Sequence, residues 1–409
     1  MSNRYNGNNR YNSSRYNNNR YDNSRYEDNN RRPRKKKKSN GLLIVLLVLI
    51  AILVLFIAVI VRDALTADPD SEPGFVRRVL APITNPEPTP RPRTDVLTGI
   101  EHQNPLTGEP MDLGLAQYRP LAVVLNNISD SLPHNGVSDA DIIYEYPVEG
   151  GLTRMLALYQ DIADVELIGS IRSARHYTVQ IAQSYDAILV GAGRSAQAQD
   201  EVRALGIPFL NEVEGAQRDV FFRDRNRIPG RRVDNLHAVV TTGERMMHWL
   251  PEYGFRLLHE QHFDNLLSFA GDATPQNGSN ANNVVARLSS GKSSTFIFDA
   301  GEGTYHMHQY NRDFIDANDD SRPAFTNVLI LKTSVTNIAG DASGRLNVTT
   351  TGSGDGYFIS GGKYIEITWS RNNVNSPFYY TLRNGAPLEL GIGKTFICIT
   401  PNSLDPTFE

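Results

Sequence analysis

Two short stretches place arginine and serine side chains where a predicted strand passes into a predicted helix. Their sequences, GSIRSARHY at 169–177 and GAGRSAQAQ at 191–199, repeat an Arg-Ser-Ala step. Free backbone amides at a helix N-terminus attract anions, and the planar guanidinium group matches phosphate and carboxylate. The stretches therefore predict an anion site built from Arg172, Ser173, Arg175, Arg194 and Ser195.

The elements around these stretches decide whether the two sets of side chains meet. Apolar runs such as DAILVGAG alternate with helical patterns such as SAQAQDEVRALG, which indicates strand–helix–strand crossovers and parallel strands. Right-handed crossovers bring successive helix N-termini to the same edge of a sheet. We therefore expect Ser173 and Ser195 to cap neighbouring helices, with the arginines gathered beside them.

A hairpin is predicted just upstream, because Gly150 and Gly151 lie between two β-prone runs. Its flanking residues Glu149 and Arg154 are charged. Arg154 would add a fourth arginine to the anion site, and Glu149 would orient one of the arginines. The alternative is an internal network in which hairpin carboxylates neutralise the arginines.

Other chemistries match the same residues less well. GAGRSA fits G-x-G-x-x-A, but it does not follow the first strand and an arginine occupies a crowded position, so no dinucleotide cofactor is predicted. Ser195 lacks the glycine two residues later that a nucleophile elbow requires. An envelope hydrolase or transferase using Glu149 as acid or base stays open, although the sequence favours a protein that is not an enzyme.

Histidine and cysteine give little sign of metal or thiol chemistry. His306 and His308 lie two residues apart, on one face of a predicted strand. They supply two metal ligands and no third, so no metal site is predicted. Cys398 is the only cysteine, so an intramolecular disulfide is excluded. Its alternating apolar surroundings predict a buried strand position.

The N-terminal segment, residues 1–41, is basic and repetitive, with five Arg-Tyr pairs separated by polar residues. Residues 1–40 carry twelve Lys and Arg against three acids, a net charge of +9, which leaves −13 for the rest of the chain. So few apolar side chains predict a disordered cytoplasmic tail, either a solvated tether or a weak contact with RNA or anionic lipid. The acidic remainder is poorly suited to nucleic acid, because phosphate neutralisation dominates that binding.

A run of twenty residues without a polar side chain, 42–61, follows the basic tail. At about 1.5 Å per residue, this length matches a hydrocarbon core of about 30 Å. Four lysines precede the run and an acidic segment follows it, which places the N-terminus in the cytoplasm and the rest outside. We expect a transmembrane helix at 42–62 and a proline-rich stalk at 63–98.

The pattern of predicted secondary structure changes along the folded region. Strand and helix patterns alternate up to about residue 270, whereas short β-prone runs separated by Gly, Asn and Asp dominate afterwards. We therefore expect an α/β domain with a mostly parallel or mixed sheet at 99–270. A smaller, mostly-β domain is expected at 271–409.

Several motifs follow one another along the folded region in a characteristic order. They are RPLAVVLNN, GVSDADIIYEYPVEGGLTRMLALYQ, GSIRSARHY, DAILVGAGRSAQA and DNLHAVV, with GYFISGGKYIEITWSRNN and GAPLELGIGKTFICITP near the C-terminus. This order resembles the YerB-like family of bacterial envelope lipoproteins, a family of unknown function. The resemblance covers the chain from about residue 100 onward and implies an extracytoplasmic location.

The resemblance is specific but incomplete. The chain departs from the family in its transmembrane anchor and in DNLH, so His237 is not carried over as a matched histidine. No reaction is implied. The positions of interest that the resemblance implies are Glu149, Gly150, Gly151, Thr153, Arg154, Arg172, Ser173, Arg175 and Ser195.

Together these patterns predict a single-pass membrane protein whose extracytoplasmic part binds an anionic envelope ligand. A glycan, a peptidoglycan fragment or a lipid-linked phosphate would fit, held by Arg154, Arg172, Arg175 and Arg194. A third alternative is a scaffold without catalysis that recruits cell-wall enzymes through the β domain.

Overall fold

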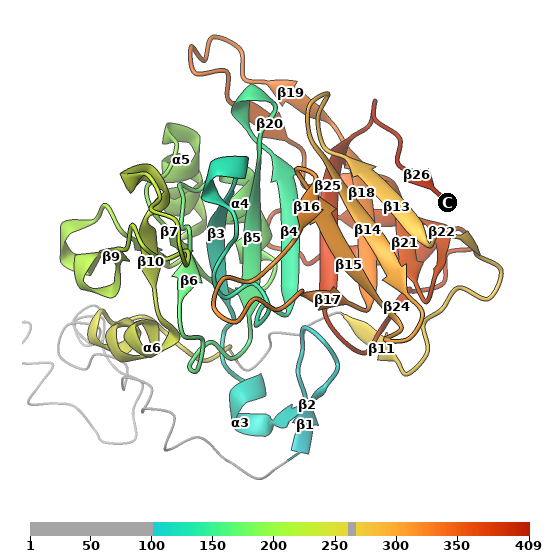
Figure 1. Ribbon diagram of the computed structural model, residues 1–409, viewed down its shortest axis with the longest axis horizontal. Helices are drawn as coiled ribbons and strands as arrows, with labels where there is room; N and C mark the ends of the chain where they lie inside the picture. The colour runs from blue at the N-terminus through green and yellow to red at the C-terminus, as the bar shows by residue number, and fades with distance from the viewer. Residues whose placement is uncertain (1–100, 261–266) are drawn as a thin grey trace, which may run out of the picture. The chain divides into compact units, whose positions relative to one another are not determined.

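An eleven-stranded mixed sheet runs through the middle of the molecule (Figure 1). The computed structural model describes residues 101–260 and 267–409. From one edge to the other the sheet contains β12 (Ser279–Asn280), β22 (Lys363–Arg371), β21 (Gly352–Ser360), β18 (Asn327–Thr333), β25 (Thr395–Pro401), β4 (Ile142–Pro147), β5 (Thr153–Tyr159), β3 (Leu121–Asn127), β7 (Ile188–Gly191) and β8 (Phe209–Asn211), with β23 (Tyr379–Leu382) paired to β22.

Strand direction changes several times across this sheet. β3, β7 and β8 run parallel to one another, and β25 runs parallel to both of its neighbours, β18 and β4. The other pairings are antiparallel. β4 and β5 form the hairpin that the adjacent glycines predicted, and Gly150 (φ +73°) and Gly151 (φ +71°) both take the left-handed conformation at its turn.

A six-stranded sheet packs against part of the large sheet. Its strands are β16 (Arg312–Asp313), β15 (Thr304–Gln309), β14 (Ser293–Asp299), β13 (Asn283–Arg287) and β26 (Thr407–Phe408), with β17 (Ala324–Phe325) paired to β15. The smaller sheets are β6 (Ile168–Gly169) with β10 (Val239–Thr241) and β9 (Phe222–Arg223), β1 (Glu101–Gln103) with β2 (Pro110–Asp112), β11 (Ser268–Ala270) with β24 (Glu389–Gly391), and β19 (Val335–Asn337) with β20 (Leu346–Val348).

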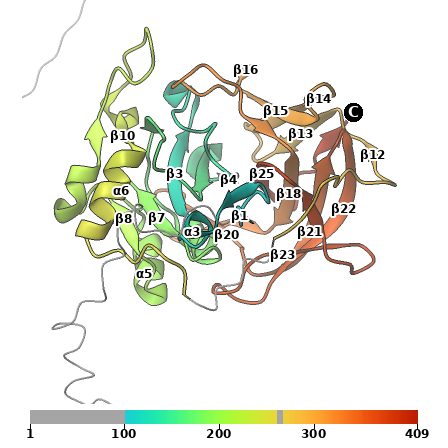
Figure 2. The ribbon, with the colours of Figure 1, turned by 90° about the horizontal axis from the view of Figure 1, so that it is seen from below.

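The helices are short. They are α3 (Leu113–Ala116), α4 (His176–Gln183), α5 (Ala196–Leu205) and α6 (Gly243–Glu252). Gly206, in the left-handed conformation, ends α5 as the sequence predicted. Figure 2 shows α5 and α6 grouped near β7 and β8, at the opposite end of the sheet from β21 and β22.

The central strands β3, β4 and β5 are buried on both faces of the large sheet. Successive side chains of a strand point to opposite sides, so each strand contributes to two cores. On β3, Val123 and Leu125 join a core formed with the six-stranded sheet, whereas Ala122 and Val124 join a core formed with α4 and α5. Such strands read as continuous apolar runs rather than alternating ones. Cys398 is fully buried on β25, as predicted.

The predicted fold class is wrong. Strands account for 41% and helices for 15% of the structure, so the protein is mostly β and not an α/β domain followed by a smaller β domain. The two halves share one sheet because β25, from the second half, inserts beside β4, from the first. The predicted strand VELIGSIR contributes only β6, which pairs antiparallel with β10 outside the large sheet.

Several predictions concern residues outside those that the structure describes. The tail at 1–41, the transmembrane helix at 42–62 and the stalk at 63–98 all lie there. Among the helices at 101–260 and 267–409, none combines the length and apolarity needed to cross a bilayer.

Candidate functional site

The two arginine–serine junctions lie side by side. Ala174 N donates to Gly193 O at 3.0 Å, and Ser195 N donates to Ala174 O at 3.1 Å. These bonds form a parallel bridge between Ala174 and Arg194. The segments that lead into α4 and α5 are therefore fixed to each other by their backbones.

The serines of the junctions have structural partners. Ser195 caps α5, with its Oγ accepting from Ala198 N at 3.1 Å, as predicted. The prediction for Ser173 is wrong, because α4 is capped at Arg175, whose N–H donates to Thr178 Oγ1 at 2.7 Å. Ser173 Oγ instead donates to a backbone carbonyl oxygen of the second junction at 2.7 Å.

Glu149 and two arginines form an ion-pair cluster at the end of the β4–β5 hairpin. Arg175 forms a bidentate ion pair with the Glu149 carboxylate. Its Nε lies 3.1 Å from Oε2, and its Nη2 contacts Oε1. Arg154 Nη2 lies 4.0 Å from the same Oε1, and its Nη1 donates to Ser173 O. Arg154 and Arg175 are both nearly buried, at 8% and 5% exposed.

Electrostatics keep Glu149 ionised. Burial alone would raise the pKa of Glu149, but the hydrogen bonds from Arg175 and the charge of Arg154 hold that pKa below its ordinary value. Burial lowers the pKa of Arg154 to about 10, and the neighbouring charge of Arg175 acts in the same direction. Arg154 therefore stays charged at neutral pH, in surroundings short of negative charge.

Among the four arginines of the predicted anion site, Arg172 is the one without a carboxylate partner in the described residues. Its Nη1 donates to Leu236 O at 3.0 Å, and its Nε is buried without a hydrogen-bond partner among the described residues. No carboxylate of those residues lies within ion-pair distance of it. Burial and the charges of Arg175 and Arg223 lower the pKa of Arg172, and the charge of Glu149 offsets this lowering only in part.

The cluster of Arg154, Arg172, Arg175 and Glu149 therefore has surplus positive charge. It contains three guanidinium groups and one carboxylate, which pairs with Arg175 and lies 4.0 Å from Arg154 but is not paired with Arg172. Buried or half-buried charges are costly unless paired, so such a surplus favours an anion as the missing partner. We call these four residues the arginine cluster.

Arg194 is engaged apart from the arginine cluster. Its Nη2 lies 2.6 Å from Glu214 Oε1, its Nε donates to Gln199, and its guanidinium lies over the Phe209 ring at 5.8 Å. This arginine fits the internal-network alternative for its own junction.

Sequence reasoning missed the polar residues at the end of β3. Asn126 Nδ2 lies 2.9 Å from His237 Nδ1, and burial followed by the charge of Arg172 lowers the pKa of His237. Ser170 Oγ and His134 Nδ1 nearby are buried without hydrogen-bond partners among the described residues. The paired asparagines that close RPLAVVLNN were the only local signal of this polar end.

His134 predicts a loss of stability in mild acid. It is fully buried, and burial, aided by Arg227 and Lys292, lowers the pKa of His134 from 6.5 to about 3. Between these values the unfolded chain binds the proton and the folded chain does not, so stability is present at neutral pH and falls as the pH falls. We expect the free energy of unfolding, measured in urea, to be about 2 kcal/mol smaller at pH 5 than at pH 7 because of this group.

Substitution separates this effect from other titrations. His134→Gln should flatten the pH dependence between pH 7 and 5, whereas His176→Gln, at a partly exposed position on α4, should leave it unchanged. An unaltered slope in His134→Gln would contradict the assignment.

The structure adds carboxylates near the histidine pair of β15. His306 Nε2 lies 2.9 Å from Glu302 Oε2, and Asp299 joins them within 4.8 Å. His308 Nδ1 lies 2.8 Å from Asp313 Oδ1. The sequence analysis found no carboxylate at ligand spacing. These carboxylates reach His306 because the turn between β14 and β15 folds Asp299 and Glu302 back onto it.

Family models match most of the described region. The model described as "Protein of unknown function (DUF3048) N-terminal domain" matches residues 106–252, and the DUF3048 C-terminal domain matches residues 284–397. The chain belongs to the DUF3048 family. The arginine cluster lies within the part that matches the N-terminal domain.

The chain is similar in sequence and in structure to one Bacillus subtilis protein. The curated protein "Putative lipoprotein YerB" of B. subtilis (strain 168) is 28% identical over 308 residues, covering 73% of this chain and 86% of YerB. The crystal structure of YerB from B. subtilis has a TM-score of 0.64 at 26% identity, covering 75% of this chain and 99% of that chain. The resemblance to the YerB-like family is confirmed.

Proposed function

We propose that this DUF3048 protein binds an anionic ligand of the cell envelope at the arginine cluster. The observation that carries the proposal is the surplus charge at Arg172, whose guanidinium has no carboxylate partner among the described residues. A phosphate or carboxylate placed there would gain charge-assisted hydrogen bonds of about 1.5–3 kcal/mol each. Glu149 holds Arg175 in position and limits the surplus to two charges.

The cellular setting of the proposal comes from the sequence and from YerB. A basic tail before an apolar run favours a single-pass anchor with the rest of the chain outside the membrane. The word "lipoprotein" in the printed name of YerB supports an envelope location. A glycan carrying acidic groups, a peptidoglycan fragment or a lipid-linked phosphate fits that setting. Contacts of the tail with RNA or anionic lipid belong to the same proposal, whereas recruitment of cell-wall enzymes by the β-rich half is the alternative of a scaffold without catalysis.

An enzymatic role for Glu149 has less support. A general acid needs a raised pKa, whereas the pKa of Glu149 is lowered and its carboxylate is gripped by Arg175. A group held ionised in this way can orient a cation but is poorly placed to donate a proton.

Alanine substitution of Arg172 tests the binding proposal. With inorganic pyrophosphate as the probe and the full-length protein in detergent, Arg172→Ala should weaken binding by about tenfold or more, because one charge-assisted contact is lost. The melting temperature without probe should change little, since Arg172 makes one hydrogen bond to Leu236 O.

Arg194→Ala is the matched control, because that arginine stands at the second junction and is paired with Glu214. It should leave pyrophosphate binding unchanged. Equal losses in the two variants, or no binding by the unmodified protein, would contradict the proposal. The double variant Arg172→Ala and Arg175→Ala also breaks the pair with Glu149, so severe unfolding there would identify a structural network instead.

A further inference from the structure

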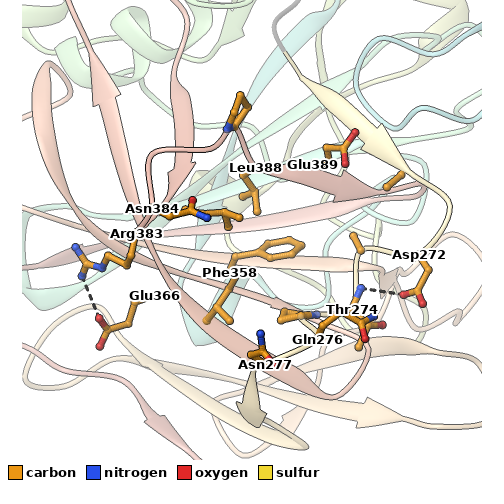
Figure 3. A pocket seen from close by; sticks show the side chains of 16 residues that line it. Asp272, Thr274, Gln276, Asn277, Phe358, Glu366, Arg383, Asn384, Leu388 and Glu389 are labelled. Atoms are coloured by element: carbon orange, nitrogen blue, oxygen red, sulfur yellow. Dashed lines mark hydrogen bonds and ion pairs between the residues drawn. The ribbon is translucent and has the colours of Figure 1, made fainter.

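A cavity of about 690 Å³ lies in the C-terminal half of the chain. The segment after β11 forms one wall, and β21, β22 and β23 with the turn that follows them form the rest (Figure 3). It shares no residue with the arginine cluster. Its volume falls in the range of about 300–1,000 Å³ typical of small-molecule sites.

The interior of this cavity is apolar. Phe358 on β21, Ile365 on β22, Leu382 on β23 and Leu388 line it, and Phe358 lies at its centre in Figure 3. Phe358 is only 1% exposed, so its ring is a fixed part of the core rather than a mobile surface group. Such a lining accepts an apolar ligand body of moderate size.

Carboxylates surround this apolar interior. Glu366 lies at one side, and Asp272 and Glu389 lie at the other (Figure 3). The one cation of the lining, Arg383, is shared between Asp355 at 2.8 Å and Glu366 at 3.2 Å. Three lining carboxylates against one guanidinium, which Asp355 outside the lining also shares, leave at least two negative charges around the mouth.

Glu389 is the carboxylate best placed to meet a ligand. It is exposed, and no hydrogen bond or ion pair of its side chain exists among residues 101–260 and 267–409. The opposite wall adds the amide side chains of Gln276 and Asn277, whose oxygens accept hydrogen bonds. An anion would meet repulsion at this mouth, whereas an ammonium or guanidinium group would meet the unpaired carboxylate of Glu389 and that of Asp272, which accepts from Thr274 N at 2.9 Å.

We infer that this cavity binds a small organic cation: an ammonium or guanidinium group carried on an apolar body. The apolar body lies over the partly exposed side chains of Ile365 and Leu382, and the cationic head meets Glu389 and Asp272. The two sites of the protein thus select opposite charges. This inference stands on the cavity alone and is independent of the ligand at the arginine cluster.

Three compounds with one apolar body and different head groups test the inference. They are 4-phenylbutylamine, 4-phenylbutan-1-ol and 4-phenylbutanoic acid, each titrated into the full-length protein in detergent by calorimetry at low salt. The amine should bind about two- to fivefold tighter than the alcohol, and the acid more weakly than both, as expected for exposed charge pairs. Stronger binding of the acid than of the amine, or no binding of the amine, would overturn the inference.

Variants locate the binding. Glu389→Gln combined with Asp272→Asn should weaken amine binding by about fivefold and leave alcohol binding unchanged. Glu252→Gln, an exposed carboxylate on α6, is the matched control and should change neither. Ala273→Trp, which fills the cavity from its wall, should abolish binding of all three compounds while pyrophosphate binding persists. Unchanged amine binding in the Glu389 and Asp272 double variant would place the amine elsewhere and refute the site.

Discussion

Replacement of Lys292 by methionine is expected to lower the free energy of unfolding by about 3–5 kcal/mol, measured in urea at neutral pH. Lys292 is 3% exposed, and its Nζ lies 2.9 Å from Oε1 of Glu145, which is fully buried. Removing the ammonium leaves a carboxylate inside the protein without a countercharge. The remaining donors to Glu145, including Thr153 Oγ1 at 2.7 Å and Ser294 Oγ at 2.6 Å, are neutral and compensate only in part.

A second substitution separates the charge effect from lost packing. Glu145→Gln in the Lys292→Met background should restore much of the lost stability, because no uncompensated charge is then buried. A double variant that is less stable than Lys292→Met would contradict this explanation. Glu145 on β4 and Lys292 before β14 lie in the two parts matched by different family models, so the pair also joins these parts.

Replacement of Arg371 by leucine is expected to cost about 3–4 kcal/mol of unfolding free energy. Arg371 is fully buried and has no carboxylate within ion-pair distance among the described residues. Its guanidinium instead donates to the backbone oxygens of Ser376, Gln180 and Val374 at 2.6–2.7 Å. Leucine would leave the oxygens of Ser376 and Val374 without this donor, whereas Gln180 O would keep its bond from Ser184 N at 3.3 Å.

Burial of the Arg371 guanidinium disfavours its charged form. Burial lowers the pKa of Arg371 to about 10, and the Phe378 ring, 4.9 Å from the guanidinium carbon, covers one face. Arg371→Lys, which keeps the charge but loses the fork, should recover only part of the stability. Arg203→Leu, at an exposed position of α5, should change stability little, and a similar loss there would show a general effect of removing arginine.

Local patterns in the sequence predicted local structure well. The glycine pair predicted the β4–β5 hairpin, Ser195 predicted the N-terminal cap of α5, and Gly206 predicted the end of α5. Each of these features depends on a few neighbouring residues. Strand pairing across the chain has no such local signal. The apolar run of β25 reads the same whether it joins its own half or inserts beside β4, which is why the fold class was wrong.

The same limit applies to the arginine cluster. The expected order of strands and helices predicted that the two junctions lie together. In the structure their arginines differ, because Glu214 neutralises Arg194 whereas no described carboxylate reaches Arg172. Glu214 lies three residues beyond β8, and nothing in its surroundings marks it as the partner of Arg194. Which arginine keeps an unpaired charge is decided by side-chain geometry, which residue spacing does not specify.

The surplus charge at Arg172 is most directly tested by nitrogen NMR of the arginine side chains during a titration with pyrophosphate. The Arg172 Nε–H is buried and has no partner among the described residues, so an anion bound there should shift its resonance, with saturation at increasing pyrophosphate. The resonance of Arg194, already engaged by Glu214 and Gln199, should stay in place. A titration in which the Arg172 resonance does not move, or in which exposed Arg203 moves as much, would contradict the proposed site.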